Sequence, residues 1–239
     1  MTAIASQKFI KLGHPSYVWR RGQERRLDLI RRYVPLEGRR ILDVGCGIGT
    51  YVTRFREFSD DVYGVDIDED KVTMASRRLK NIFHAPAEKL PFADNSFDVV
   101  MLHEVIEHVE DDRESIREAV RCLRPGGQVV IFAPNRLYPF ETHGFFVGKK
   151  FVFRLLPLIN YTPDFIRNIF CHHVRIYTQR GIKRLFDGQP VGHRPVLAAC
   201  DYIRGGHYAS GVRNLSFHRR TQNAHCLSTV EAGKAAYGP

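Results

Sequence analysis

Between residues 20 and 135 the chain alternates between short apolar runs and longer amphipathic segments. In the amphipathic segments, apolar residues recur three and four positions apart, as they do on one face of an α-helix. Short apolar strands that alternate with such helices are typical of a parallel sheet covered on both faces. The pattern therefore predicts an α/β fold with a doubly wound, mostly parallel sheet. The predicted strands are 41–44, 62–65, 81–83, 97–102, 129–132 and, nearer the end of the chain, 194–200.

The predicted helices also have recognisable boundaries. Pro35 and Gly38 close the first of them, and Asp111 and Glu114 stand at capping-box spacing before the fourth. The ligands of doubly wound sheets bind beyond the carboxyl ends of the strands, so functional residues are expected just after each strand. The predicted helices cover residues 20–34, 50–58, 69–80, 112–123 and 178–186.

A glycine cluster directly follows the first strand. Gly45, Gly47 and Gly49 allow the backbone to approach a nucleotide closely, and the next helix begins there. Asp66 closes the second strand, where a carboxylate can accept both hydroxyls of a ribose. Dinucleotide sites use GxGxxG, whereas the spacing here is GxGxG with Thr50 after the third glycine. The spacing therefore favours a nucleotide cofactor other than a nicotinamide dinucleotide.

Five motifs in order extend this observation. LDVGCGIG is followed by VYGVDID, AEKLPFADNSFDVV, HEVIEHVED and RCLRPGGQVVIFAPN. The series resembles the class I S-adenosylmethionine-dependent methyltransferases of the type 11 group, which have a Rossmann-like fold. The resemblance covers about residues 38–135 and extends toward residue 186. It implies that S-adenosyl-L-methionine is the cofactor and that the protein is a methyltransferase.

The resemblance also assigns roles within the cofactor site. Asp66 is expected to bind the ribose hydroxyls, Ile67 to pack on adenine, and His103 to lie beside the sulfonium. Pro86 stands where family members often carry an Asp that touches adenine, which leaves that edge to backbone contacts and Glu88. The methionine part would be held by Asp43, Gly45, Cys46, Gly47 and Gly49, and the adenine edge by Ala87 and Glu88.

The EVIEH segment is a candidate metal site. Glu104, Glu107 and His108 share one face if a helical turn follows the fourth strand. Two carboxylates and an imidazole can hold a divalent ion such as Mg²⁺ or Zn²⁺, and His172 or His173, with His173 favoured, is expected to add a ligand. The arrangement is similar to that of metal-dependent O-methyltransferases that act on quinone precursors or on small RNA. Such an ion would lower the pKa of an acceptor hydroxyl.

The same segment has two other interpretations. In many related methyltransferases the final Glu-His pair only packs and forms structural hydrogen bonds. Without a metal, an imidazole can serve as general base, since it titrates near neutrality. The candidates for that base are His103, His108, His143 and His173.

The expected domain organisation follows these motifs. An N-terminal helical lid (1–37) precedes the cofactor-binding core (38–135), and the core resumes at 177–202 after an inserted cap (136–176). Residues 203–239 show little apolar periodicity and are expected to form a loose tail. In the cap, residues 145–159 are expected to form an apolar helix that brings Lys149, Lys150 and Arg154 together. Such a helix could lie on an anionic membrane.

Charge is distributed unevenly along the chain. Residues 1–40 hold 10 Lys/Arg and 3 Asp/Glu, residues 41–135 hold 11 and 18, and residues 136–239 hold 15 and 5, for a net charge of +10. Basic flanks favour an anionic partner such as phosphate, nucleic acid or a membrane surface. No RNA-binding module is recognisable, however, and we expect no specific nucleic-acid partner. The predicted acceptor is a small, hydroxylated, hydrophobic molecule, with an RNA methyltransferase or a non-catalytic cofactor-binding subunit as alternatives.

Composition sets the remaining limits. The 239 residues are 44% hydrophobic, which suits one α/β domain with an elaboration. No apolar run reaches the length of a membrane span, and the first 16 residues lack a signal-peptide core. We therefore expect a cytoplasmic protein, with peripheral membrane contact left open. The five cysteines form no CxxC pair, which argues against a thiolate zinc site or a disulfide framework.

Overall fold

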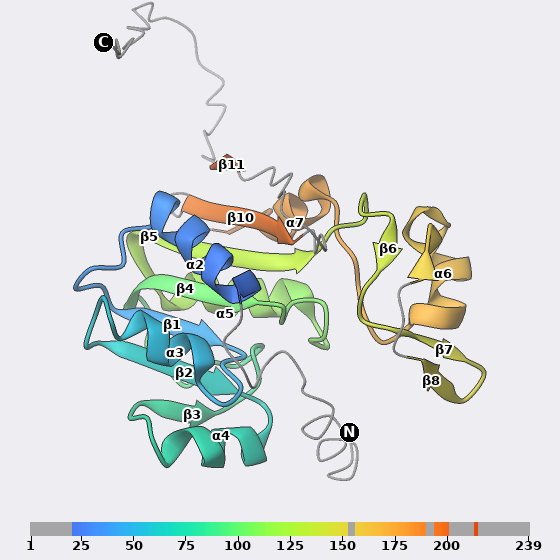
Figure 1. Cartoon of the computed structure of the whole chain (residues 1–239). Coiled ribbons are helices and arrows are strands. Elements are labelled where there is room, and N and C mark those ends of the chain that lie inside the picture. The colour runs from blue at the N-terminus through green and yellow to red at the C-terminus, as the bar shows by residue number, and fades with distance from the viewer. Residues whose placement is uncertain (1–20, 153–155, 190–193, 201–212, 215–239) are drawn as a thin grey trace, which may run out of the picture.

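The computed structural model describes residues 21–152, 156–189, 194–200 and 213–214 of the chain. It contains a seven-stranded sheet in the order β11-β10-β5-β4-β1-β2-β3 (Figure 1). Neighbouring strands are parallel except for the antiparallel pair β10 and β11. The predicted doubly wound α/β fold is confirmed. The strands are β1 (Ile41–Val44), β2 (Val62–Asp66), β3 (Ile82–His84), β4 (Phe97–His103), β5 (Leu123–Pro134), β10 (Arg194–Cys200) and β11 (Arg213–Asn214).

Helices cover both faces of this sheet. On one face, Leu27 and Ile30 of α2 and Phe55 of α3 pack against the residues of β1, β4 and β5 that point to this face. On the other face, Ile116 of α5 and Leu185 of α7 pack with the alternate residues of the same strands. Both sides of each central strand are therefore buried, as the apolar runs predict. The helices of this part are α2 (Arg21–Tyr33), α3 (Thr50–Phe55), α4 (Glu69–Ser76), α5 (Asp112–Cys122) and α7 (Gln179–Leu185).

The helices over residues 50–58 and 69–80 are shorter than predicted, because their last residues form turns. The cap of α5 also differs in part from the expected capping box. Asp111 accepts the backbone N–H groups of Arg113 and Glu114, as an N-cap does. The Glu114 side chain pairs with Arg117 instead of reaching back. The N–H of Asp111 is accepted by Glu88, so a carboxylate from another loop completes the cap.

Chain order reverses between β1 and β4. From β1 the chain moves outward to β2 and β3, and then crosses to the opposite side of β1 to form β4 and β5. Ligands of open α/β sheets bind at this reversal, beyond the carboxyl ends of the strands. The turn after β1 and the segment after β4 therefore share one crevice.

The cap is built from residues 136–176 and lies beyond the carboxyl ends of the strands (Figure 1). Strands β6 and β9 form one antiparallel pair, and β7 and β8 form another. It comprises β6 (Phe140–Glu141), β7 (Phe145–Val147), β8 (Lys150–Val152), β9 (Leu156–Pro157), the 3-10 helix η2 (Ile159–Tyr161) and α6 (Asp164–Cys171).

The helix expected over residues 145–159 is wrong. Residues 145–152 of this segment form a β-hairpin that turns at Gly148, whose φ of 59° is left-handed and ends any helix, and residues 156–157 and 159 belong to β9 and η2. Aromatic and β-branched residues on both sides of that glycine favour strands. Lys149 and Lys150 lie at the hairpin tip, while Arg154 lies outside the described residues.

Two other expectations also involve residues outside the described ranges. Most of the tail (203–239) is not described apart from β11, and residues 1–20 of the expected lid are not described either. The described part of that lid is α2, which begins and ends within one residue of the predicted helix.

Candidate functional site

The turn after β1 depends on its glycines. Gly45 has a φ of 73°, and a Cβ at this position would lie 2.2 Å from a methyl carbon of Val105. Only glycine combines that backbone conformation with so close an approach. The next glycine, Gly47, donates its backbone N–H to a carboxylate oxygen of Asp66 at 2.7 Å. The turn is thus tied to the end of β2.

Asp66 is buried and faces this turn. Its second oxygen accepts the N–H of Asp68 at 2.9 Å. The N-cap of α4 is Asp68, whose side chain accepts the N–H of Lys71, so Asp66 is not the helix cap. Carboxylate oxygens have further lone pairs, and those of Asp66 stand at the site where a ribose is expected.

Asp43 in β1 is buried next to Asp66. Burial and the neighbouring negative charge raise the pKa of Asp43 to about 8. A carboxyl in this state ionises readily when a cation such as an amino acid ammonium comes close. Cys46 is also buried, and burial raises the pKa of its thiol well above the usual range. Its thiol therefore stays protonated and packs in the turn, where it is not a nucleophile.

The expected adenine edge follows β2 and β3. Ile67 is largely exposed just after β2, which leaves its side chain free to cover a flat ring. Ala87 is buried beneath this edge. Glu88 accepts the backbone N–H groups of Glu110 and Asp111, at 2.8 and 3.3 Å. It therefore links the loop after β3 to the start of α5, and contact of this edge with adenine remains a prediction.

The EVIEH segment does not form the expected helical turn. Glu104 has a positive φ of 56°, so the chain leaves β4 in a direction that an α-helix cannot continue. The Glu104 side chain turns to α2 and pairs with Arg26 at 2.7 Å. The three residues therefore do not share one face, and the predicted arrangement is wrong in this respect.

Arg26 also holds His103. Its guanidinium donates to Nε2 of His103 at 2.7 Å. Burial and this positive charge lower the pKa of His103 to about 3, while Arg26 holds the pKa of Glu104 near 2. His103 is thus a neutral group at the end of β4, and a poor proton acceptor. The position of His103 beside the sulfonium stays a prediction.

Glu107 and His108 meet a histidine from the cap instead. Side-chain ligand atoms of Glu107, His108 and His143 all lie within 4.8 Å of one another. Nε2 of His143 is 3.8 Å from a carboxylate oxygen of Glu107, and Nε2 of His108 is 4.0 Å from the same oxygen. The cap therefore closes onto the segment after β4.

Glu107 is 1% exposed, and neither of its carboxylate oxygens has a hydrogen-bond partner among the described residues. Burial and the charge of Glu104 raise the pKa of Glu107 to about 8. His108 has a pKa lowered to about 4, first by burial and then by His143. An unsatisfied buried carboxyl is costly, and such groups cluster at functional sites.

His143 has an acid on each side of its ring. Nδ1 lies 3.1 Å from Glu141, and Glu107 stands on the Nε2 side. Burial disfavours the imidazolium, but the carboxylates outweigh it, so the pKa of His143 is raised above its ordinary value. Glu141 in turn accepts from Arg167 of α6 at 2.6 Å. Of the four candidate bases, His143 is the one whose surroundings favour taking up a proton.

His173, expected among the metal ligands, does not join this group. Its ring packs against Phe146 and Phe151 of the β-hairpin, with centroids 5.3 and 5.6 Å away. The neighbouring His172 lies against Phe146 as well. The set that converges is therefore Glu107, His108 and His143, and not the predicted set with Glu104 and His173.

Three residues of the site, Arg26, Glu141 and Arg167, are not apparent from the sequence. Each pairs with a residue at least 26 positions away, so no local spacing shows the contact. The one signal for Glu141 is its place two residues before His143 in the ETHG segment.

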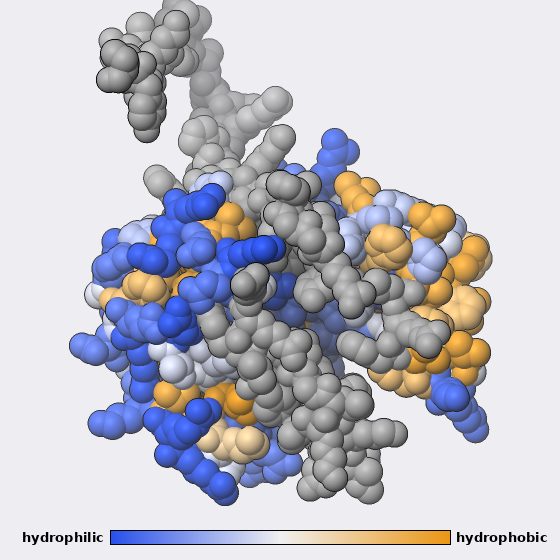
Figure 2. Space-filling view, viewed as in Figure 1, coloured by the Kyte–Doolittle hydropathy of each residue, from blue (hydrophilic) through white to orange (hydrophobic). Residues whose placement is uncertain are grey.

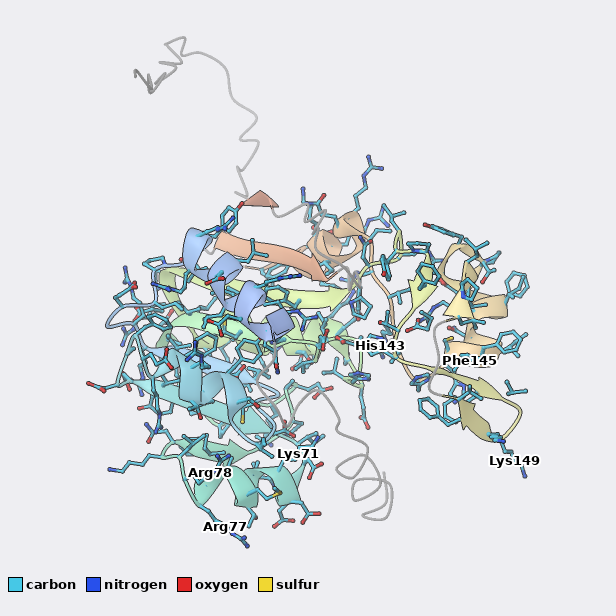
Figure 3. All side chains as sticks on the ribbon, viewed as in Figure 1. Lys71, Arg77, Arg78, His143, Phe145 and Lys149 are labelled. Carbon is cyan, nitrogen blue, oxygen red and sulfur yellow. The ribbon has the colours of Figure 1, made fainter. Side chains whose placement is uncertain are left out.

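A pocket lies where these elements meet, and Arg26, Glu104 and His143 are among the residues that line it. Figure 3 shows His143 on the side of the cap nearest the sheet, whereas Lys149 is at the far tip of the hairpin. The pocket thus lies between the cap and the carboxyl ends of β4 and β5.

Comparisons with known proteins agree with this geometry. Residues 42–131 match the family model described as a methyltransferase domain. A ubiquinone biosynthesis O-methyltransferase of Coxiella burnetii is 28% identical over 185 residues, covering 75% of this chain and 78% of that protein. A protein of the same description from Aromatoleum aromaticum is 33% identical over 152 residues, covering 60% of this chain and 63% of its own length.

The fold has a solved counterpart. A crystal structure of an S-adenosylmethionine-dependent methyltransferase from Mesorhizobium loti is 22% identical, with a TM-score of 0.50. The match covers 66% of this chain and 76% of that one. It supports the Rossmann-like methyltransferase fold that the motifs imply. Residues 42–131 thus match a methyltransferase domain, and the comparisons support S-adenosylmethionine-dependent methyl transfer, from this cofactor to an acceptor, as the activity of the protein.

Proposed function

We propose that this methyltransferase acts on a hydroxyl group of a small hydrophobic acceptor. The observation that carries the proposal is Glu107, a buried carboxyl without a hydrogen-bond partner among the described residues, which lies 3.8 Å from His143. A hydroxyl must lose its proton as it takes up the methyl group, so its enzyme benefits from a proton acceptor. Relatives named as ubiquinone biosynthesis O-methyltransferases support a hydroxylated aromatic acceptor.

In this proposal His143 is the general base. It lines the pocket, and the ionised Glu141 beside Nδ1 stabilises the imidazolium that forms, while Glu107 stands on the Nε2 side of the ring. The neighbouring acids raise the pKa of His143, which makes it a stronger proton acceptor than an ordinary imidazole. The remaining residues position the reactants, because direct transfer from a sulfonium needs the acceptor oxygen in line with the methyl group.

We propose that Asp66 and the Gly45–Gly49 turn hold the cofactor, as their place between β1 and β2 favours. Asp43 would pair with the ammonium of its methionine part. Ile67, Ala87 and Glu88 would surround the adenine. Neutral His103 would line the path of the methyl group at the end of β4, with Arg26 fixing its ring.

The residues around Glu107 also fit a divalent cation. Its unsatisfied carboxylate and the imidazoles of His108 and His143 offer three ligand atoms within 4.8 Å, a set of donors that suits Zn²⁺ better than Mg²⁺, which prefers oxygen ligands. A bound ion would supply positive charge that lowers the pKa of the acceptor hydroxyl. His143 cannot be ligand and base through the same nitrogen, so the two mechanisms are alternatives.

The surface of the cap supports contact with an anionic membrane, where a hydrophobic acceptor would reside. Phe165 and Ile169 are 74% and 66% exposed and lie one helical turn apart on α6. Apolar residues gather over this part of the molecule (Figure 2), and Lys149 and Lys150 stand at the hairpin tip. Among the described residues no helix is long and apolar enough to cross a bilayer. Any such contact would be peripheral.

Methyl transfer to hydroxylated aromatic compounds, with and without an alkyl chain, tests the proposal. With labelled cofactor, we expect an O-methylated product and higher activity on the longer-chain compounds. His143→Gln should lower kcat about 100-fold or more, the range for loss of a general base. His172→Gln, an exposed cap histidine, is the matched control and should keep activity. Cofactor affinity, measured by calorimetry, should be unchanged in both variants.

Different results would redirect the proposal. Methylation of RNA, weakened steeply by salt, would favour the nucleic-acid alternative. Loss of activity with a chelator and recovery with Mg²⁺ or Zn²⁺ would favour the cation over the base. Activity indifferent to chelators would remove the cation and leave His143. If none of the hydroxylated compounds is methylated, the hydroxyl acceptor itself is wrong.

A further inference from the structure

The cap has an ionic core. Arg167 is only 2% exposed and is among the largest fully buried side chains of the described residues. Its guanidinium donates to Glu141 at 2.6 Å, to the carbonyl of Val174 at 2.7 Å and to the carbonyl of Cys171 at 3.2 Å. One residue thus joins α6, the segment after it and β6. A buried pair of this kind costs desolvation, and apolar residues of similar size would often be as stable. Stability alone therefore does not explain its charges.

The ion pair of Arg167 and Glu141 lies next to the imidazole of His143. Arg167 holds one carboxylate oxygen of Glu141, and the other oxygen accepts the backbone N–H groups of Thr142 and His143, both at 3.0 Å. The same oxygen lies 3.1 Å from Nδ1 of His143. An ionised carboxylate oxygen can only accept a hydrogen bond, so this contact requires Nδ1 to carry the proton. The lone pair of the neutral ring is then on Nε2, the nitrogen that faces Glu107.

From this geometry we propose that Glu141, fixed by Arg167, is the positioning residue for His143. It selects the ring tautomer and aims Nε2 at Glu107 and the acceptor pocket. The inference rests on the proposed function of His143, and it holds whether Nε2 takes a proton or binds a cation. Partners of this kind fix the tautomer and orientation of functional histidines, and losing them costs about 10–100-fold in activity or metal affinity.

The variant Glu141→Gln keeps the shape and removes the charge. We expect kcat for a hydroxylated acceptor to fall about 10–100-fold while the affinity for S-adenosylhomocysteine is unchanged, because the cofactor residues lie elsewhere. The matched control is Glu118→Gln in α5, which breaks another buried pair, with Arg121. That control should lower the melting temperature and leave kcat unchanged.

A double variant separates positioning from stability. Glu141→Gln with Arg167→Met removes both charges, so it should regain much of the melting temperature lost in Glu141→Gln. Activity should stay low, since His143 still lacks its charged acceptor. If activity returns together with the melting temperature, the pair is only structural and the proposal is wrong.

Nitrogen-15 NMR of the imidazole tests the tautomer without any acceptor. Wild-type His143 should be protonated on Nδ1, and Glu141→Gln should lower that population, with the signal identified by its loss in His143→Gln. A wild-type ring protonated on Nε2 would overturn the proposal. Because this readout needs no turnover, an enzyme inactive on hydroxyl compounds but with the Nδ1 tautomer would refute only the proposed function.

Discussion

Arg26 and Glu104 form an ion pair at 2.7 Å although 78 positions separate them in the chain. The pair joins the N-terminal helix α2 to the end of β4. The guanidinium of Arg26 supplies the positive charge beside Glu104. Glu104 is thereby withdrawn from Glu107, His108 and His143, which explains why the candidate metal set has one acid fewer than the EVIEH segment suggests.

Replacing that guanidinium should therefore change cation binding. We expect Arg26→Gln to increase the affinity for Mn²⁺ or Mg²⁺, measured by calorimetry, because Glu104 becomes available as an additional ligand. The melting temperature should fall as well, since the Arg26 side chain is largely buried and also donates to His103. Arg54→Gln is the matched control, as Arg54 also pairs α2 to the core, through Glu24, but away from the site. Equal cation affinity in both variants would contradict the argument.

Cofactor binding should depend on Asp66 more than on the adjacent Asp68. Each charge-assisted hydrogen bond to a ribose hydroxyl is worth about 1.5–3 kcal/mol, so Asp66→Ala should weaken S-adenosylhomocysteine binding at least tenfold. Asp68→Ala removes the N-cap of α4 and should cost about 1 kcal/mol of stability with little change in affinity. The two variants are compared by calorimetry and thermal unfolding. Tight binding of a nicotinamide dinucleotide would contradict the cofactor assignment itself.

The sheet could be predicted because its strands are buried on both faces and its helices are amphipathic. Apolar runs as short as 41–44 and 97–102, set between amphipathic helices, are typical of central strands in a parallel sheet. The glycine turn could be predicted in the same way, since Gly45 adopts a positive φ that favours glycine. In both cases the relevant physics is local to the chain, and the sequence displays it directly.

The arrangement around Glu107 and His143 could not be predicted in the same way. The helical arrangement of EVIEH fails at Glu104, whose left-handed φ is stabilised by a partner in α2. The contact of Glu107 with His143 depends on how the cap folds back, and the cap turned at Gly148 where we expected a helix. Ion pairs between distant residues leave no periodic pattern in the sequence. The spacing of residues therefore could not show whether His143 or His173 lies beside Glu107.

Burial of Glu107 should lower the stability of the folded protein at high pH. Its pKa is raised from 4.5 to about 8 in the folded protein, so the folded state keeps a proton that the unfolded chain has already lost in this range. The contribution of Glu107 to the free energy of unfolding therefore falls as pH rises from about 4.5 to about 8. Glu107→Gln removes this penalty and should stabilise the protein at pH 8 by at least ~1 kcal/mol, with little effect near pH 4.5.

Thermal unfolding across this pH range measures that effect, and Glu107→Gln should lose activity at the same time. Glu118→Gln is a control of opposite sign, because hydrogen bonds from Arg121 lower the pKa of Glu118. The carboxylate of Glu118 stabilises the fold above its unfolded pKa, so that variant should be less stable at pH 8. A Glu107→Gln protein that is less stable at pH 8 would show that Glu107 is only structural.

The exposed face of the cap should govern binding to membranes. The α6 helix directs Phe165 and Ile169 outward while Arg167 and Cys171 are buried on its other side. Burying a large apolar side chain contributes about 1.5–3 kcal/mol, so Phe165→Ser with Ile169→Ser should lower partitioning onto phosphatidylglycerol vesicles at least tenfold.

The basic residues at the hairpin tip can be tested in the same vesicle experiment. Lys149→Glu at the hairpin tip should weaken binding to anionic vesicles, because a basic residue near such a surface contributes about 1 kcal/mol. Arg77→Glu, which makes the same change in charge beside α4, is the control, and Figure 3 shows it far from the cap. Membrane contact through the cap predicts loss for Lys149→Glu alone, and stronger loss at low salt. Equal effects of the two charge variants would mean that only net charge matters. If no wild-type protein sediments with the vesicles, membrane contact is removed from the proposed function.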